Sequence, residues 1–200
     1  MNDGGDLLKK NKKDILKNNM ANKIVPISPA QVSIAGVKIL ERKIFYDERG
    51  FLIETFSRSK EEDKSVYSYV SFTRPGFARD VDKFHFHRLQ KDRFTVVFGK
   101  MWILLYDARE SSPTLGKLEV VEMSGGDPMI TQKEEFPVYT LTIPEGVYHG
   151  IKNPGPGLAA LINHPTAEYN PADEGRILFS QVPIPRLKGE YFSWDKVFLK

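Results

Sequence analysis

The 200-residue chain contains no cysteine, which excludes disulfides, thiolate zinc sites and cysteine nucleophiles. No apolar run approaches the roughly 18 residues needed to span a bilayer, and the N-terminus lacks the basic-then-apolar order of a secretory signal. The formal charge of +3 is only mildly basic, so nucleic-acid binding gains little support. We therefore expect neither a membrane nor a nucleic acid as partner, and the cytoplasm is the simplest location.

Three widespread phosphate and nucleophile motifs are also missing from the chain. There is no G-x-S-x-G, no G-x-x-x-x-G-K-S/T and no G-x-G-x-x-G. These absences argue against a serine hydrolase, a P-loop enzyme and a dinucleotide-dependent oxidoreductase. No organic cofactor is expected.

The composition changes near residue 35. Residues 1–34 are rich in Lys and Asn and predict a polar tail, either mobile or forming a short amphipathic helix lined by Leu7, Leu8, Ile15 and Leu16. Residues 35–200 read as one domain of short runs rich in β-branched and aromatic residues, separated by Gly, Pro, Asn and Asp clusters. The runs lie within residues 37–47, 51–56, 66–73, 94–108, 117–123, 138–143 and 158–163. Many short strands without alternating helices predict an all-β sandwich or barrel.

Histidine is scarce, with four in the chain, and two of the four fall in the stretch KFHFHRLQKD. If residues 83–87 form a strand, its period of two places His85 and His87 on one face. Asp92 follows in the spacing H-x-H-x4-D-x6-G, and IPEGVYHGIKN later places His149 in P-x-G-x-x-H-x-x-x-N. Two imidazoles, a carboxylate and a third histidine are a chemically suitable set for a divalent metal.

These two stretches resemble the two motifs of the cupin superfamily. The resemblance implies a double-stranded β-helix, or jelly roll, whose metal ligands would be His85, His87, Asp92 and His149. The metal would be Fe, Mn, Ni, Co or Zn. Asp92 stands where the superfamily usually has Glu.

Four further stretches resemble a narrower branch, the dTDP-4-dehydrorhamnose 3,5-epimerase family. They are DERGFLIETF from Asp47, GFAR from Gly76, DARESSPTLGK from Asp107 and IPEGVYHG from Ile143. The resemblance covers residues 37–182 and implies a small-molecule substrate, namely a nucleotide sugar. It also implies a homodimer in which the DERGFLIETF strand supplies residues to the pocket of the neighbouring subunit.

The same resemblance implies roles for individual residues. His85 matches the base that removes a proton next to the keto group of the sugar, and Arg79 matches the arginine that meets the diphosphate. Arg49 and Glu54 match nucleotide contacts, with a structural pair in a turn as the alternative.

Three catalytic positions depart from the family pattern. Asp92 stands where the family has a lysine, and Gln181 stands where it has the aspartate that orients the base. Asn163 holds the position of the acid tyrosine, and we expect it to contact the substrate instead. Tyr148 and Tyr169 are alternative acids, although packing in the core or at the rim is the stronger explanation for both.

Two functions remain open from the sequence. One is an epimerase or isomerase acting on a dTDP-type 4-keto-6-deoxy sugar in surface carbohydrate biosynthesis. The other is a metal-binding cupin without epimerase chemistry, which acts on another small molecule or serves as a sugar-binding or regulatory module. His85 cannot easily serve in both, because metal coordination occupies the lone pair that would accept a proton.

Overall fold

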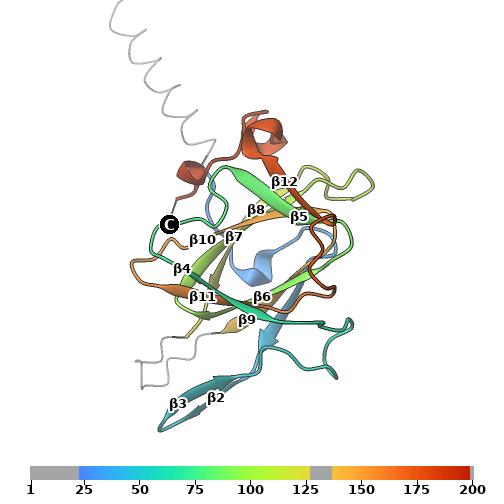
Figure 1. Cartoon of the computed structure of the whole chain (residues 1–200). Coiled ribbons are helices and arrows are strands. Elements are labelled where there is room, and N and C mark those ends of the chain that lie inside the picture. Colours follow the sequence, from blue (N-terminus) through green and yellow to red (C-terminus); the bar gives the residue numbers. More distant parts are fainter. Residues whose placement is uncertain (1–22, 127–136, 199–200) are drawn as a thin grey trace, which may run out of the picture.

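The computed structural model describes residues 23–126 and 137–198, which form strands and a few single-turn 3-10 helices (Figure 1). The strands are β1 Lys38–Arg42, β2 Ile44–Asp47, β3 Gly50–Ile53, β4 Tyr69–Thr73, β5 Lys83–His87, β6 Asp92–Phe98, β7 Lys100–Asp107, β8 Leu118–Ser124, β9 Val138–Ile143, β10 Val147–Lys152, β11 Ala159–Asn163 and β12 Glu174–Leu178. The 3-10 helices are η1 Pro29–Gln31, η2 Phe179–Gln181, η3 Pro185–Leu187 and η4 Trp194–Lys196. Within this part of the chain, no helix has the length and apolar character needed to cross a membrane.

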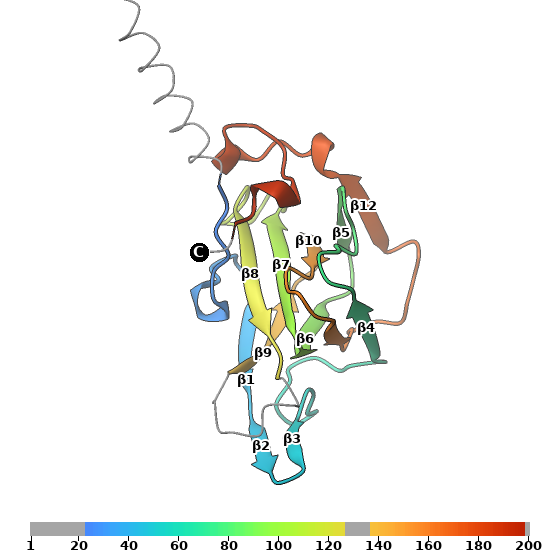
Figure 2. The ribbon, with the colours of Figure 1, turned by 90° about the vertical axis from the view of Figure 1, so that its left-hand side faces the viewer.

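Two antiparallel five-stranded sheets lie face to face, in the orders β1-β9-β6-β11-β4 and β12-β5-β10-β7-β8. The all-β jelly roll expected from the sequence is therefore confirmed, and each predicted run contains at least one strand. β12 was not predicted, because its sequence EGRIL has neither a β-branched cluster nor clear alternation. β2 and β3 form a separate hairpin that projects away from the sandwich (Figure 2).

The sequence of β7 is a nearly continuous hydrophobic run, because both faces of this strand are buried. Alternate side chains, Met101, Ile103 and Leu105, pack between the two sheets. The intervening ones, Trp102, Leu104 and Tyr106, pack on the outer face beneath the C-terminal segment that contains η4. In a strand that is buried on both faces, successive side chains still point to opposite faces, but apolar and polar residues no longer alternate along the sequence. The second sheet, which also carries the predicted histidines, is thus held from both sides.

Part of the predicted polar tail belongs to the packed domain. Ile24 and Ile34 are buried in the two hydrophobic clusters. Ile24 also forms a bridge with Val197, and Ile27 forms one with Val121. The domain thus starts before residue 35, because these isolated apolar side chains cover exposed edges of the core. The predicted helix between Leu7 and Leu16 lies outside the described residues.

The strand pairing brings the two histidine stretches together. His149 on β10 lies directly opposite His85 on β5 in the antiparallel register. The turn that leads into β10 needs Gly146, which has φ of +75° and whose added Cβ would lie 2.9 Å from Cγ of Arg109. The amide of Gly146 donates to the carbonyl of His87 at 2.7 Å. The P-x-G turn therefore fastens the start of β10 to the end of β5.

Candidate active site

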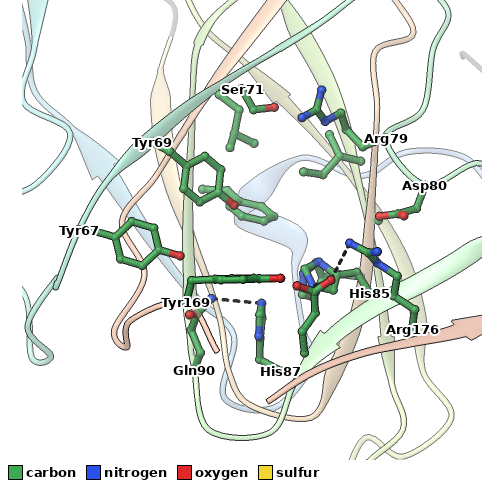
Figure 3. Close-up of a pocket in the computed structure, with 16 residues that line it drawn as sticks. Tyr67, Tyr69, Ser71, Arg79, Asp80, His85, His87, Gln90, Tyr169 and Arg176 are labelled. Atoms are coloured by element: carbon green, nitrogen blue, oxygen red, sulfur yellow. Dashed lines mark hydrogen bonds and ion pairs between the residues drawn. The ribbon is translucent and has the colours of Figure 1, made fainter. Parts of the chain in front are cut away.

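A cavity of about 540 Å³ opens between the two sheets. β5 and β10 contribute histidines from one sheet, while β4 contributes Tyr69 and Ser71 from the other. In Figure 3, Tyr67 and Tyr69 lie on one side of the cavity, and His85 and Arg176 lie on the other. A ligand in this space would therefore meet the imidazoles on one face and the phenols on the opposite face.

His85 is the predicted base, and it lines the cavity with 22% of its side chain exposed. Its Nε2 lies 3.5 Å from Oε1 of Glu174 and has no hydrogen-bond partner in the described protein. Burial, followed by the charges of His149 and His87, lowers the pKa of His85 to about 3. His85 is therefore neutral at physiological pH and presents a ring nitrogen lone pair that can accept a proton.

Glu174 is the carboxylate beside His85, and the sequence did not identify it. Its Oε1 also pairs with Arg176 at 2.6 Å, and Arg176 lies opposite His85 in the β12–β5 register. Gln181, which stands at the family position of the orienting aspartate, is exposed and accepts the backbone N–H of Leu178 instead. Glu174 was missed because the strand that carries it was missed.

His87 is held by polar groups on both ring nitrogens. Its Nε2 lies 3.1 Å from Nε2 of Gln90, and its Nδ1 lies 3.3 Å from Oδ2 of Asp173. Because an amide nitrogen can only donate, Nε2 of His87 accepts and Nδ1 carries the proton. Asp173 is itself fixed by the backbone N–H groups of Arg88 and Leu89, at 2.9 and 2.8 Å. This chain of contacts sets the orientation of the His87 ring.

Asp92 is buried between the sheets and contacts residues from both. Its Oδ1 accepts from Gln90 and from Asn163, at 2.9 and 2.8 Å, while its Oδ2 lies 3.3 Å from Nε2 of His149. Burial alone would raise the pKa of Asp92. The interaction with His149, the charge of His87 and the Asn163 hydrogen bond outweigh burial and hold the pKa at about 2. Asp92 is therefore ionised across the physiological range.

His149 faces this carboxylate with one nitrogen and the backbone with the other. Its Nδ1 lies 3.1 Å from the carbonyl of Val147, so Nδ1 must be the donor. Nε2 lies 3.3 Å from Oδ2 of Asp92, and this contact is one cause of the low pKa of Asp92. It joins the two sheets at the cavity wall.

The structure brings the predicted metal set together but does not arrange it as a ligand shell. The ring centroid of His85 lies 4.7 Å from that of His87 and 5.0 Å from that of His149. Among residues 23–126 and 137–198, however, no group of three or more His, Asp or Glu side chains has a geometry that could hold a metal ion. The physical reason is that Asp92 faces His149 as an ion-pair partner, and His87 faces Gln90 and Asp173.

Asn163 is expected to contact the substrate, but its side chain does not line this cavity. It is fully buried, and its Nδ2 donates to Asp92 at 2.8 Å and to the Tyr69 hydroxyl at 3.0 Å. Its Oδ1 accepts the backbone N–H of Arg93 at 2.8 Å. Both amide hydrogens and the carbonyl oxygen are thus used inside the protein, so Asn163 positions its neighbours.

The predicted nucleotide contacts divide into two groups. Arg79 lies at the exposed rim of the cavity, where its guanidinium makes a long hydrogen bond of 3.4 Å to the carbonyl of Phe72. Arg49 pairs with Asp47 in the β2–β3 hairpin, and Glu54 pairs with Lys60 beyond it. The hairpin projects away from this cavity (Figure 2). Within one subunit, Arg79 reaches the site and Arg49 and Glu54 do not.

Several cavity residues were not predicted from the sequence. They are Tyr67, Tyr69, Gln90, Glu174 and Arg176. Tyr67 and Tyr69 alternate in VYSYVSFT, so the period of two placed them on one face, but it gave no indication that this face borders a cavity. Tyr169 lines the cavity, whereas Tyr148 stacks on Phe86 with ring centroids 4.4 Å apart.

Comparisons with known proteins agree with this architecture. A family model described as dTDP-4-dehydrorhamnose 3,5-epimerase matches residues 31–185. The chain is 31% identical to spore coat polysaccharide biosynthesis protein SpsL of Bacillus subtilis, over 82% of this chain and 99% of that protein. It is 29% identical to dTDP-4-dehydrorhamnose 3,5-epimerase of Salmonella typhimurium, over 77% of this chain and 81% of that protein.

Solved structures show the same fold. The dTDP-6-deoxy-D-glucose-3,5-epimerase of Legionella pneumophila, in complex with dTDP-4-keto-L-rhamnose, superposes with a TM-score of 0.62 at 25% identity, over 84% of this chain and 85% of that chain. A dTDP sugar isomerase of Desulfovibrio desulfuricans gives a TM-score of 0.63 at 24% identity, over 81% of this chain and 92% of that chain.

The low pKa of Asp92 makes stability depend on pH. The folded-state pKa of about 2 lies below the ordinary 3.8, so the stabilisation is present above about pH 4 and is lost as the pH falls toward 2. Asp92→Asn should reduce the free energy of unfolding by roughly 2 kcal/mol at neutral pH. Urea unfolding at about pH 7, 5 and 3 should show the gap to wild type narrowing with acid. Exposed Asp195→Asn is the control, and a pH-independent gap would contradict the assignment.

Proposed function

Because the chain belongs to the dTDP-4-dehydrorhamnose 3,5-epimerase family, we propose that it inverts a carbon next to the keto group of a dTDP-linked 4-keto-6-deoxy sugar. The product would enter the biosynthesis of a surface carbohydrate, consistent with the spore coat polysaccharide protein among its relatives. The observation that carries the proposal is the neutral His85 in a cavity between the two sheets. A cytoplasmic location stays a prediction from the sequence.

The chemistry needs a base on one face of the sugar and stabilisation of the enolate oxygen. His85 accepts the proton from the carbon next to the ketone, which breaks the C–H bond and leaves an enolate. The electrostatic influence of His149, which contributes to the low pKa of His85, also favours negative charge in the cavity. Return of a proton to the opposite face inverts the carbon. No electrons are gained or lost, so the reaction requires no redox cofactor.

The nucleotide diphosphate would bind at the rim of the cavity. Arg79 and Arg176 are both exposed there, and a planar guanidinium can bind phosphate oxygens through two parallel hydrogen bonds. Arg79 is the better candidate, because Arg176 already pairs with Glu174. The Legionella relative binds dTDP-4-keto-L-rhamnose, which supports a dTDP sugar as the ligand of this cavity.

His85→Asn tests the proposed reaction directly. The variant should lose proton exchange between the carbon next to the ketone and solvent by about 100-fold or more, because general base catalysis contributes 10²–10⁴-fold. The measurement is NMR-detected deuterium incorporation into a dTDP-4-keto-6-deoxy sugar in D2O. Exchange at the wild-type rate in this variant would rule out His85 as the base.

Binding of dTDP, measured by calorimetry, provides the control for this experiment. His85→Asn should retain the wild-type affinity, which shows that the pocket is intact. Arg79→Ala should weaken binding about tenfold or more, since a charge-assisted hydrogen bond contributes roughly 1.5–3 kcal/mol. Arg74→Ala removes an exposed arginine outside the cavity and should leave binding unchanged.

A metal-binding cupin is the second candidate. Nε2 of His85, Nε2 of His149 and Nδ1 of His87 are buried and make no well-formed hydrogen bond, although the last two lie 3.3 Å from the carboxylates of Asp92 and Asp173. Their present arrangement does not form a ligand set, as described above. We therefore base no reaction step on a metal.

Elemental analysis separates the two candidates. Wild-type protein purified without a metal-affinity step should carry no stoichiometric Fe, Mn, Ni, Co or Zn, and His149→Ala should give the same result. Near-stoichiometric metal that disappears in His149→Ala would favour the metal-binding candidate and would remove His85 from its role as a free base.

A homodimer is the proposed assembly. Phe45 and Leu52 lie opposite each other in the β2–β3 hairpin, so they share one face, and they are 48% and 61% exposed. A two-stranded ribbon with an uncovered apolar face is marginal alone and gains stability when another surface covers it. The proposed cover is a second copy, whose pocket would then receive Arg49.

Leu52→Asp should shift the protein from dimer toward monomer in sedimentation velocity, because it places a charge in this apolar contact. Leu89→Asp is the matched control, since Leu89 is exposed in the loop between β5 and β6. A wild-type monomer at micromolar concentration, or a dimer unaffected by Leu52→Asp, would refute the proposed interface.

A further inference from the structure

Asn163 and Tyr69 form a pair that joins neighbouring strands. They lie directly opposite each other in the β11–β4 register, and Nδ2 of Asn163 donates to the Tyr69 hydroxyl at 3.0 Å. The family's acid tyrosine is expected at the Asn163 position, which here carries an amide. We propose that Tyr69 supplies the proton to the face of the sugar opposite His85, so that the catalytic phenol comes from the adjacent strand. This inference rests on the proposed epimerase function.

The orientation of the Asn163 amide is fixed by two independent contacts. The backbone N–H of Arg93 can only donate, so the atom that it meets at 2.8 Å is the carbonyl Oδ1. Ionised Asp92 can only accept, so the atom that it meets is Nδ2. The second hydrogen of Nδ2 therefore points at the Tyr69 oxygen, and that oxygen acts as the acceptor.

The hydroxyl proton of Tyr69 is consequently not used in this contact. Because the phenol oxygen accepts from Asn163, its own hydrogen is free to point elsewhere, and Tyr69 lines the cavity. Burial raises the pKa of Tyr69 to about 12, although the Asn163 hydrogen bond opposes the rise. The phenol is therefore protonated at neutral pH. The same Asn163 hydrogen bond stabilises the phenolate that forms once the proton has left.

The placement of Tyr69 relative to His85 suits inversion. Tyr69 comes from β4 in one sheet and His85 from β5 in the other, and both line the same cavity from opposite sides (Figure 3). A flat enolate between them would have the imidazole on one face and the phenol on the other. Removal of a proton by His85 and delivery of a proton by Tyr69 then give the inverted carbon.

The proton balance closes without a further reactant. His85 becomes an imidazolium as the C–H bond breaks, and Tyr69 becomes a phenolate as the new C–H bond forms on the opposite face. The sugar keeps its composition and oxidation state. Proton exchange with water returns both side chains to their starting states before the next turnover.

The other two tyrosines of the cavity are less suited to this role. Tyr169 is 64% exposed, compared with 43% for Tyr69. Tyr67 stacks on Tyr69 with ring centroids 6.1 Å apart and an interplanar angle of 29°, which supports the Tyr69 ring. Within residues 23–126 and 137–198, Tyr69 is the one of the three whose hydroxyl is held by a buried side chain.

Tyr69→Phe separates proton removal from inversion. In D2O with a dTDP-4-keto-6-deoxy sugar, the variant should still exchange the proton next to the ketone, because His85 can remove it and return a deuteron to the same face. Formation of the epimer should fall about 100-fold or more, the lower end of a general acid contribution. Tyr191→Phe, which removes the hydroxyl of an exposed tyrosine outside this cavity, should keep both activities near wild type.

The outcomes distinguish this inference from the function on which it rests. Normal inversion by Tyr69→Phe, beside an active wild type, would overturn the role of Tyr69 and leave the epimerase function intact. A wild type that neither exchanges nor inverts would overturn the epimerase function together with this inference. Thermal unfolding and dTDP binding of Tyr69→Phe should match those of Tyr191→Phe, and loss of both activities together with dTDP binding in Tyr69→Phe would show a structural role instead.

Discussion

The contact between Asp92 and its neighbours from both sheets is the interaction on which the site depends. Asp92 stands on β6 of one sheet, meets His149 on β10 of the other, and accepts the Asn163 amide from β11 beside it. A buried carboxylate is stable only when charge and hydrogen bonds compensate for its desolvation. The sheets are thus joined at the cavity by one ionised group, and the orientations of His149, Asn163 and, through Asn163, Tyr69 follow from it.

Linked substitutions explain how a family pocket can work with altered residues. An aspartate in place of the family lysine would leave an uncompensated negative charge if nothing else had changed. Oδ2 of Asp92 lies 3.3 Å from Nε2 of His149, and Nδ2 of Asn163 donates to Oδ1 of Asp92 at 2.8 Å. The same amide then reaches Tyr69 on the next strand. The departures at Asp92 and Asn163 are therefore one rearrangement of hydrogen bonds, and Gln181 lies outside it.

The sequence predicted the fold well because strand runs and turn residues are local signals. Period-two alternation placed His85 and His87 on one face, and the resemblance to cupins placed His149 beside them, as the His149–His85 pairing of β10 and β5 confirms. The charge partners were not predictable in this way. Glu174 lies on an unpredicted strand, and the Asn163–Tyr69 contact depends on the register of β11 and β4. Such contacts between distant segments leave no periodic trace in one sequence.

The candidate site is built from both sheets, so its geometry can change when the packing between the sheets changes. The proposed base and acid are separated by the thickness of the sandwich, which is set by buried side chains such as Phe94 and Leu161 that also border the cavity. Interiors are close-packed, so a change in the volume of those side chains shifts the sheets relative to each other. The proposed inversion would therefore also depend on apolar residues that take no part in proton transfer.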